Sequence, residues 1–285
     1  MTYLVLAMLL FSFNNVLWKK NLANISVALL MTYRSFFTGI FAAGLLFYFH
    51  DITAFSFIQV LKTLTANTLG VIGLVSMLTL YKKTSLQWAA IYNLLGIIFT
   101  ILYLWLFKKF DLDSSFPGLL IITIGFVYIY TKKKSNLKIN LNQHLLLVLM
   151  TLCYGSAAIL NWENLNQKTP AIFIIASQEI LVFICGTTLL LLQKKIKKPL
   201  QLVPILQSYF SRVLLMSLVI FLGLLFSFLG LEITNPIISS VLFLASPLTT
   251  ILFSAYFFKE KIKVTDWIAI GVISFGAFLL HLQTT

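Results

Sequence analysis

The stretch NPIISSVLFLASPLTTILFSAYFFKEKIKVTDWIAIGVISFGAFLLH, residues 235–281, contains two long apolar segments and a short charged one between them. Residues 235–258 and residues 264–282 are each long enough to cross a bilayer as a helix, which needs about 20 apolar residues. Pro247 lies inside the first segment, where a proline removes a backbone hydrogen bond and kinks a helix. The stretch therefore predicts a kinked span, a charged elbow over residues 259–263 and a straight span.

The composition of the chain excludes a water-soluble fold. Of its 285 residues, 60% are hydrophobic and only 10% are charged, whereas soluble domains carry about a quarter charged residues. No soluble core could bury so much apolar surface, so most side chains must face lipid or one another. The first apolar run, which begins at Tyr3, lacks the basic region and cleavage pattern of a signal peptide, and we expect a retained span.

The apolar segments predict an all-α integral membrane protein with ten spans. The breaks between them are short, and most are marked by lysine, proline or asparagine. The longest break, residues 50–62, is partly apolar, and we expect it to lie along the membrane interface. The predicted spans are residues 2–18, 26–49, 63–81, 85–107, 114–131, 142–161, 171–193, 208–231, 235–258 and 264–282.

The order of residue types indicates an internal repeat of about half the chain. Residues 8–49 and 150–193 share a plan at an offset of about 143, and residues 91–109 parallel residues 242–260 at about 150. Each half then has five spans. Because five is odd, the second half must lie upside down relative to the first, as in the inverted repeats of many secondary transporters. We predict two five-helix repeats, residues 1–138 and 139–285.

The distribution of lysine predicts the orientation in the membrane. The loops after predicted spans 1, 3, 5, 7 and 9 carry 15 lysines, and those after spans 2, 4, 6 and 8 carry 4. Loops rich in lysine and arginine stay in the cytoplasm, so the count places both termini outside. The formal net charge of +13 comes mainly from the lysines of these loops. We interpret these lysines as setting the topology and contacting lipid headgroups. It does not indicate nucleic-acid binding, because no soluble domain carries a basic face.

The opening stretch resembles the closing repeat of the EamA family, in the drug/metabolite transporter superfamily. The resemblance rests on the small residue and proline at Ser246-Pro247, on the elbow, and on the last span with its glycines. Lys259 stands where the family usually has a glycine. The first half keeps less of the pattern: Gly96 takes the place of Pro247, although Arg34 matches an arginine that is common in the second span of the family.

The resemblance implies a function. We expect a secondary transporter that moves a small organic metabolite, amino acid-like, aromatic or amphiphilic, across the cytoplasmic (inner) membrane by alternating access, with export as the direction. A lipid or polyprenyl-carrier flippase subunit of the same fold is the alternative, and a membrane enzyme or a sensor is a third reading. Many members of the family are thought to keep both termini in the cytoplasm, opposite to the orientation that the lysine count gives.

Two ionisable residues inside the spans are candidates for function, because a charge within the bilayer is costly. Arg34 lies about nine residues into the second span and Glu179 about nine residues into the seventh, so they are nearly equivalent in the repeat. Three readings stay open: a structural ion pair, a gate or substrate contact, and proton coupling through Glu179.

Uncharged polar and aromatic residues recur in spans 1, 4, 6 and 9, which are two repeat-related pairs and help to line the central cavity in the family. As a set they predict a substrate cavity, although a single polar residue in lipid often only joins helices. Four tryptophans at span ends, Trp18, Trp105, Trp162 and Trp267, are interpreted as interfacial anchors. The predicted cavity residues are Asn14, Asn15, Trp88, Tyr92, Asn93, Tyr154, Ser156, Ser239 and Ser246.

The sequence contains no motif that points to catalysis. It has no spacing of histidine and cysteine typical of a metal site, no glycine-rich phosphate loop and no Ser-His-Asp arrangement. We therefore expect no enzyme activity, no metal and no cofactor. The expected partners are a small-molecule substrate and membrane lipid, with possible proton coupling, and the expected state is a monomer or a weak homodimer. Cys153 and Cys185 both lie inside predicted spans, so we expect no disulfide framework.

Overall fold

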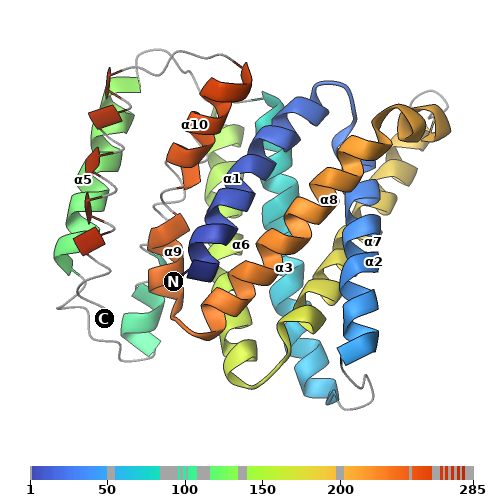
Figure 1. The fold of residues 1–285 in the computed structure, drawn as a ribbon, viewed down its shortest axis with the longest axis horizontal. Coiled ribbons are helices and arrows are strands. Elements are labelled where there is room, and N and C mark those ends of the chain that lie inside the picture. Colours follow the sequence, from blue (N-terminus) through green and yellow to red (C-terminus); the bar gives the residue numbers. More distant parts are fainter. Residues whose placement is uncertain are drawn as a thin grey trace.

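The structure is a computed structural model, and it describes the chain as a bundle of helices (Figure 1). The described residues are 2–49, 55–83, 96, 99–100, 102–107, 116–133, 140–196, 202–243 and 246–258, with residues 264–265, 267–268, 271–272, 275–276 and 278–279. Within these ranges there is no strand. The helices are α1 (Thr2–Leu22), α2 (Val27–Phe49), α3 (Phe57–Lys83), α5 (Phe116–Lys133), α6 (Leu141–Asn166), α7 (Ala171–Ile196), α8 (Leu202–Glu232), α9 (Pro236–Phe243) and α10 (Ser246–Phe258).

Six of the described helices, namely α1, α2, α3, α6, α7 and α8, are long and apolar enough to cross a membrane. Their outer faces carry the large apolar side chains that a lipid environment requires. On α6, for example, Leu141, Leu145, Val148 and Leu152 are exposed at helical spacing. The expectation of a multi-pass, all-helical membrane protein is therefore confirmed for the described residues. The predicted span over 85–107 lies mostly outside them, and residues 264–282 are described only in pieces.

Side-chain caps fix where several helices begin. Before α3, the hydroxyl of Ser56 accepts from Gln59 N at 3.3 Å, and the Gln59 side chain accepts from Ser56 N at 3.0 Å. This reciprocal arrangement is a capping box, which satisfies backbone donors that a helix start leaves unpaired. Asn140 and Gln143 form the same arrangement before α6. The start of α3 at Phe57 corrects the prediction that residues 57–62 belong to an interfacial segment outside the span.

The described part of the span predicted over residues 235–258 consists of two helices. Helix α9 ends at Phe243 and α10 begins at Ser246. Asn235 caps α9, because its Oδ1 accepts from Ile238 N at 2.9 Å. Pro247 is the second residue of α10, a position in the first turn where the missing N–H of proline costs no hydrogen bond within the helix.

The most extensive helix packing joins the two predicted halves of the chain. Helix α2 packs most extensively against α7, its predicted counterpart. The next most extensive packing is between α3 and α6 and between α1 and α8. If each helix is replaced by its predicted counterpart in the other half, the pair α3 and α6 becomes the pair α8 and α1. The same holds for α2 with α8 and α3 with α7. In Figure 1, α1 runs upward and α6 downward, α2 downward and α7 upward, and α3 upward and α8 downward.

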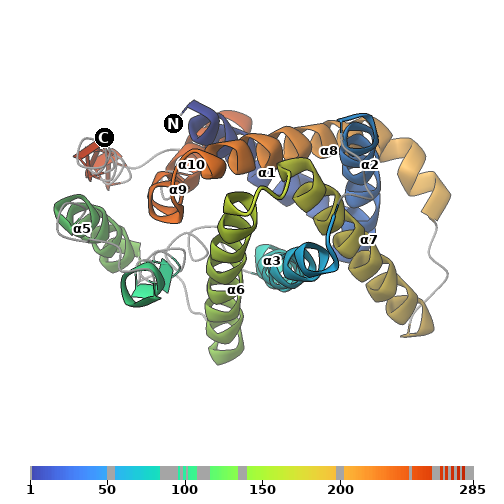
Figure 2. The same ribbon diagram turned by 90° about the horizontal axis from the view of Figure 1, so that it is seen from below.

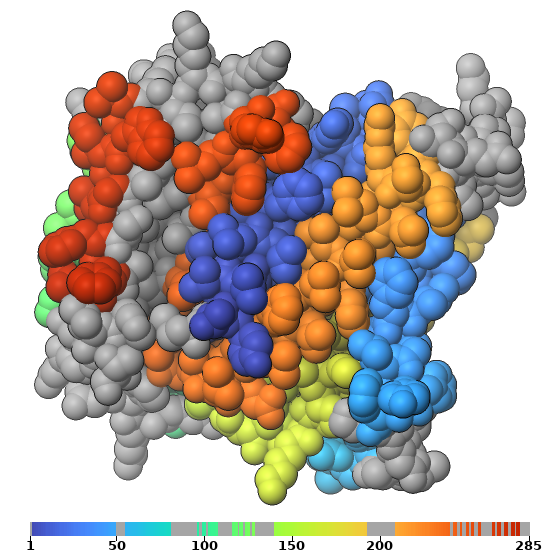
Figure 3. Space-filling model, in the orientation of Figure 1, coloured from blue at the N-terminus to red at the C-terminus, as the bar shows by residue number. Residues whose placement is uncertain are grey.

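The core of the bundle consists of two apolar clusters between these pairs. One cluster contains Leu29, Leu30 and Met216, and the other contains Ile174 and Phe221. Figure 2 shows α5 and the described C-terminal pieces together at one side of the bundle, away from α2 and α7. In Figure 3 the side chains of α1 and α8 form a continuous surface across the middle of the face shown.

Helices α2 and α7 approach so closely at one point that only glycine fits. A Cβ added to Gly186 would lie 2.7 Å from Thr32 Oγ1 and 3.0 Å from Thr32 N. The second of these atoms belongs to the backbone, so a side-chain rotation cannot relieve the overlap. The contact fixes the distance between the two central helices of the bundle.

We expect Gly186→Ala to destabilise the protein by forcing α2 and α7 apart, at a cost of about 1–3 kcal/mol for an overpacked core. The measurement is thermal unfolding in detergent, in which the variant should melt several degrees below the wild type. Gly44→Ala is the matched control on α2, because a Cβ there meets nothing within 4 Å. Equal melting points for Gly186→Ala and the wild type would contradict the close approach.

Candidate functional site

A cavity of about 400 Å³ lies inside the bundle. Its described wall comes from α1, α2, α3, α6, α7, α8 and α9, together with Gly96 and Thr100 from the segment before α5. The volume falls in the range of small-molecule sites, which are about 300–1,000 Å³. The wall is mainly apolar and aromatic, with a few polar groups, and this composition is also usual for such sites.

Several of the predicted residues line this cavity. Asn14 and Asn15 contribute from α1, Tyr154 from α6 and Ser239 from α9, and Arg34 reaches the wall from α2. Asn14 is only 5% exposed, and its Oδ1 has no hydrogen-bond partner among the described residues. The structure therefore brings residues from four parts of the sequence to one site.

Other predicted residues lie elsewhere. Ser156 and Ser246 are not among the residues that line the cavity, although Ser156 belongs to α6, which lines it with other residues. Ser246 is buried and bonds to α1 instead. Trp88, Tyr92 and Asn93 lie outside the described residues.

The lining also includes polar residues that the sequence analysis missed, of which Asn161, Gln178 and Ser227 are examples. Trp18 was predicted to anchor the membrane interface, and this prediction is wrong: its side chain is 1% exposed and lines the cavity. The spacing of Trp18 from Asn14 could have predicted its place in the cavity wall. Trp18 follows Asn14 by four residues, and residues four apart share one face of a helix.

Part of the cavity wall repeats along the chain at the offsets seen in the sequence. The lining residues of α1 are 11, 14, 15 and 18; adding 143 gives 154, 157, 158 and 161, which line the cavity from α6. The lining residues of α3 are 70, 74 and 77; adding 150 gives 220, 224 and 227, which line it from α8. Equivalent positions of the two halves thus face the same space.

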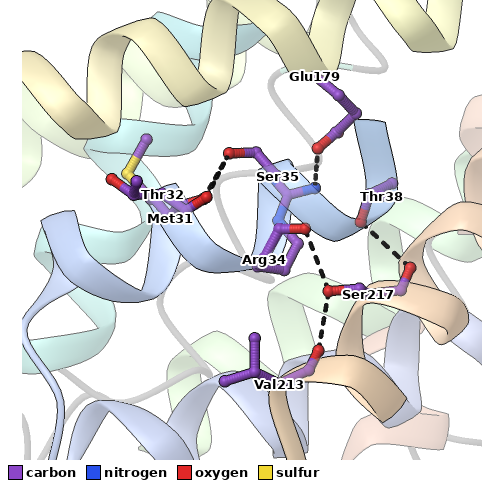
Figure 4. Close-up of polar contacts among 8 residues, drawn as sticks. All are labelled: Met31, Thr32, Arg34, Ser35, Thr38, Glu179, Val213 and Ser217. Carbon is purple, nitrogen blue, oxygen red and sulfur yellow. Dashed lines mark hydrogen bonds and ion pairs between the residues drawn. The ribbon is translucent and has the colours of Figure 1, made fainter. Parts of the chain in front are cut away.

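An ion pair joins α2 and α7 beside the cavity (Figure 4). Arg34 Nη1 lies 2.6 Å from Glu179 Oε2, and both side chains are almost fully buried. The same turn of α2 is tied to α8, because Ser217 Oγ donates to the Arg34 carbonyl oxygen at 3.1 Å. The sequence analysis placed the two charges at matching depth, and the structure places them in direct contact.

The ion pair is only partly satisfied. Arg34 Nε and Glu179 Oε1 have no hydrogen-bond partner among the described residues. A buried polar atom left unpaired costs about 1–3 kcal/mol, and more when it is charged. The guanidinium lies 5.9 Å from the centroid of the Trp18 ring, a distance at which a cation is attracted to an aromatic face. Arg34 therefore connects the buried carboxylate to the cavity wall.

A cluster of hydroxyl groups joins α1 to α10. Ser12 Oγ donates to the Met8 carbonyl oxygen at 2.7 Å and lies 3.0 Å from Ser246 Oγ. It also forms a hydrogen bond with the hydroxyl of Thr249. Ser12 is completely buried, so water does not compete for these bonds.

The equivalent contact in the other half has no such hydroxyls. Adding 143 to 12 gives Gly155, and subtracting 150 from 246 and 249 gives Gly96 and Phe99. A Cβ added to Gly155 would lie 3.0 Å from Phe99 Cδ1 and 3.5 Å from the Gly96 carbonyl oxygen. The two contacts therefore occupy corresponding positions, one through hydrogen bonds and the other through close packing of small residues.

The described residues contain no group of three or more histidine, cysteine, aspartate or glutamate side chains that could hold a metal ion. Cys153 and Cys185 are both free thiols. What the described part of the cavity offers is an apolar space with amide and hydroxyl groups and one paired cation. Such a wall suits reversible binding of a small amphiphilic molecule.

Comparisons with known proteins agree with this arrangement. The sequence model of the EamA-like transporter family matches residues 141–282. Among solved structures, 29 chains match. One of them, titled only as the crystal structure of a protein, aligns with a TM-score of 0.71 over 98% of this chain and 97% of its own, at 12% identity. At that identity the likeness shows a shared fold alone.

No curated protein matches the sequence. The family match covers α6 to α10 and the C-terminal pieces, the half that contains the stretch with Pro247, the charged elbow and the last glycines. On the evidence of this match, the chain belongs to the EamA-like transporter family.

Proposed function

We propose that this protein is a secondary transporter that moves a small organic metabolite across the cytoplasmic membrane by alternating access, in the direction of export. The observation that carries the proposal is the cavity inside a bundle of membrane-length helices, with part of its wall built from corresponding positions of the two proposed halves. The family match supports membrane transport in general. The substrate, the direction and the mechanism are proposed from the cavity and the repeat.

The fold proposed for this function has ten spans in two inverted five-helix repeats, residues 1–138 and 139–285. Three observations support it: the opposite directions of α1 and α6, α2 and α7, and α3 and α8; the exchange of packing pairs between the halves; and the two offsets in the cavity wall. In inverted repeats, each half can adopt the conformation of the other, and this exchange moves the opening of a central site from one face to the other.

The substrate proposed for the cavity is amino acid-like, aromatic or amphiphilic. Phe11, Trp18 and Tyr154 offer aromatic surface, and Asn14 offers an amide. In the repeat, Asn93 corresponds to Phe243 at an offset of 150, and Phe243 lines the cavity. We therefore include Asn93 in the proposed site, with Trp88 and Tyr92 from the same predicted span.

The proposed orientation has both termini outside. Helices α1, α3 and α7 end at the same end of the bundle in Figure 1, so the lysines in the last turn of each of these helices belong to one face. The excess of lysine on this face supports a cytoplasmic location. The proposed assembly is a monomer or a weak homodimer in lipid, and Glu179 is the proposed group for any proton coupling.

The experiment is flux into liposomes that contain the purified protein, with a panel of water-soluble aromatic and amphiphilic compounds. Stimulated flux of at least one of these compounds is the expected result. Ala158→Phe places a ring in the cavity wall and should reduce that flux at least tenfold. Val148→Phe on the same helix is the control, because Val148 is 37% exposed on the outer surface of α6.

Activity on lipids alone, with no flux of any water-soluble compound, would favour the flippase instead. Equal flux through Ala158→Phe and Val148→Phe would show that the substrate does not pass through this cavity. Size-exclusion chromatography of both variants establishes that each is folded before flux is compared.

A second prediction concerns the division of the ninth span. Pro247→Ala restores a backbone N–H close to the junction of α9 and α10, so we expect a more continuous helix and a transport rate several-fold lower. Pro236→Ala is the matched control, because Pro236 is the first residue of α9, where proline does not interrupt the helix. The measurement is the initial rate of flux in liposomes at equal protein content.

Equal rates for Pro247→Ala and Pro236→Ala would remove the proposed role of Pro247. Gly96→Ala, the corresponding change in the first half, is a poorer test of flexibility. A Cβ at Gly96 would lie 3.0 Å from Thr151 Cγ2, so the substitution changes packing as well as backbone freedom.

A further inference from the structure

One charged side chain lines the described part of the cavity, and it is Arg34. The stretches 84–95 and 244–245, which adjoin lining residues in the chain but lie outside the described residues, contain no charged residue in their sequence. The counter-charge of Arg34 is Glu179, at 2.6 Å. Glu179 is 0% exposed and is not itself a lining residue. The formal charges of Arg34 in the wall and of Glu179 behind it therefore sum to zero.

We propose that Glu179 sets the charge of the substrate: by neutralising Arg34 from behind the wall, it makes the cavity select molecules with no net charge, zwitterions included. The inference rests on the proposed transport function and adds the substrate class to it. It assigns Glu179 as a specificity-determining residue that acts through Arg34 and does not touch the substrate.

The physical reason is the cost of burying an unbalanced charge. A ligand that enters a mainly apolar cavity loses its hydration, and an ion then needs an opposite charge in the wall to compensate the loss. With Arg34 already paired, the wall supplies no such charge to an anion. A cation is rejected as well, because Arg34 lies between Glu179 and the cavity.

The position of Arg34 means that removal of the Glu179 carboxylate would change the net charge of the cavity wall. The guanidinium reaches the cavity wall and lies over the Trp18 ring. It donates to Glu179 through Nη1, and its Nε has no hydrogen-bond partner among the described residues. Without the carboxylate, the same cation would remain in the wall with an uncompensated charge. That charge would attract an anion across a short distance in a medium of low effective dielectric constant.

The uncharged groups of the wall agree with a neutral amphiphile. Asn14 and Asn161 are each 5% exposed, line the cavity and have an unpaired Oδ1. A neutral ligand with O–H or N–H groups could satisfy these acceptors without bringing a net charge. Phe228 and Phe243 add apolar surface for the rest of such a ligand.

The test uses three indole compounds of similar size that differ in charge: indole-3-ethanol is neutral, tryptamine is a cation and indole-3-propionate is an anion. Affinity is measured from the rise in melting temperature with ligand concentration, at neutral pH and fixed ionic strength. For the wild type, we expect the neutral compound to bind at least tenfold more tightly than either ion. Liposome flux of the same compounds should follow this order.

Glu179→Gln should shift the preference at least tenfold toward indole-3-propionate, because it leaves the Arg34 charge uncompensated. Glu232→Gln is the matched control: it makes the same change in the total charge of the protein, but Glu232 is exposed at the end of α8 and does not line the cavity. Its preference should equal that of the wild type. A preference unchanged in Glu179→Gln overturns the inference.

Glu179→Gln leaves a buried cation without its partner and can fail to fold. The double variant Arg34→Gln/Glu179→Gln removes both charges and decides the question in that event. Because the wall stays neutral, the double variant should keep the preference for indole-3-ethanol, and a shift toward either ion overturns the inference.

A wild type that binds an ion as tightly as the neutral compound overturns the charge selection but leaves the proposed transport function intact. A wild type that moves no compound of either panel in liposomes contradicts that function itself.

Discussion

The pairing of Arg34 with Glu179 is the constraint on which the centre of the bundle depends. Each residue alone would place an unpaired charge in the buried centre of the bundle, and the pair makes both tolerable. The pair joins α2 to α7, and the bond from Ser217 to the Arg34 carbonyl oxygen adds α8 to the same junction. Gly186 holds α2 and α7 at close range. The central helices are therefore fixed by electrostatics at one level and by backbone proximity at another.

The cavity lies where helices from both halves meet around this junction, and its wall shows how a repeat can serve a single site. Equivalent positions face the space, but their residues differ: Trp18 in α1 corresponds to Asn161 in α6. The two halves thus supply an aromatic face and an amide at corresponding places. Corresponding positions with unlike residues give a site whose two ends are chemically distinct, and this suits a ligand with an apolar end and a polar end.

Sequence reasoning predicted the fold well where one physical rule dominated. Long apolar runs predicted the bounds of α2 to within one residue and those of α7 to within three, because lipid forces backbone groups into helices. The cost of intramembrane charge singled out Arg34 and Glu179. Trp18 was misjudged because position near a span end was weighed above its four-residue spacing from Asn14. Ser56 and Gln59 had the spacing of a capping box, and that signal would have placed the start of α3. Contacts such as Gly186 against Thr32 depend on how helices approach in space, which the sequence does not encode locally.

The unequal contacts at Ser12 and at Gly155 bear on how the protein divides its time between conformations. A hydrogen bond contributes about 0.5–1.5 kcal/mol net, and a difference of about 1.4 kcal/mol between two states makes one of them tenfold more populated. If the halves exchange shapes, α1 and α10 separate at the expense of the Ser12 bonds, whereas α6 and the segment at Gly96 separate at the expense of packing alone. The empty protein is then biased toward one side of the membrane, and a substrate meets a different apparent affinity on each side because only part of the population is ready to receive it.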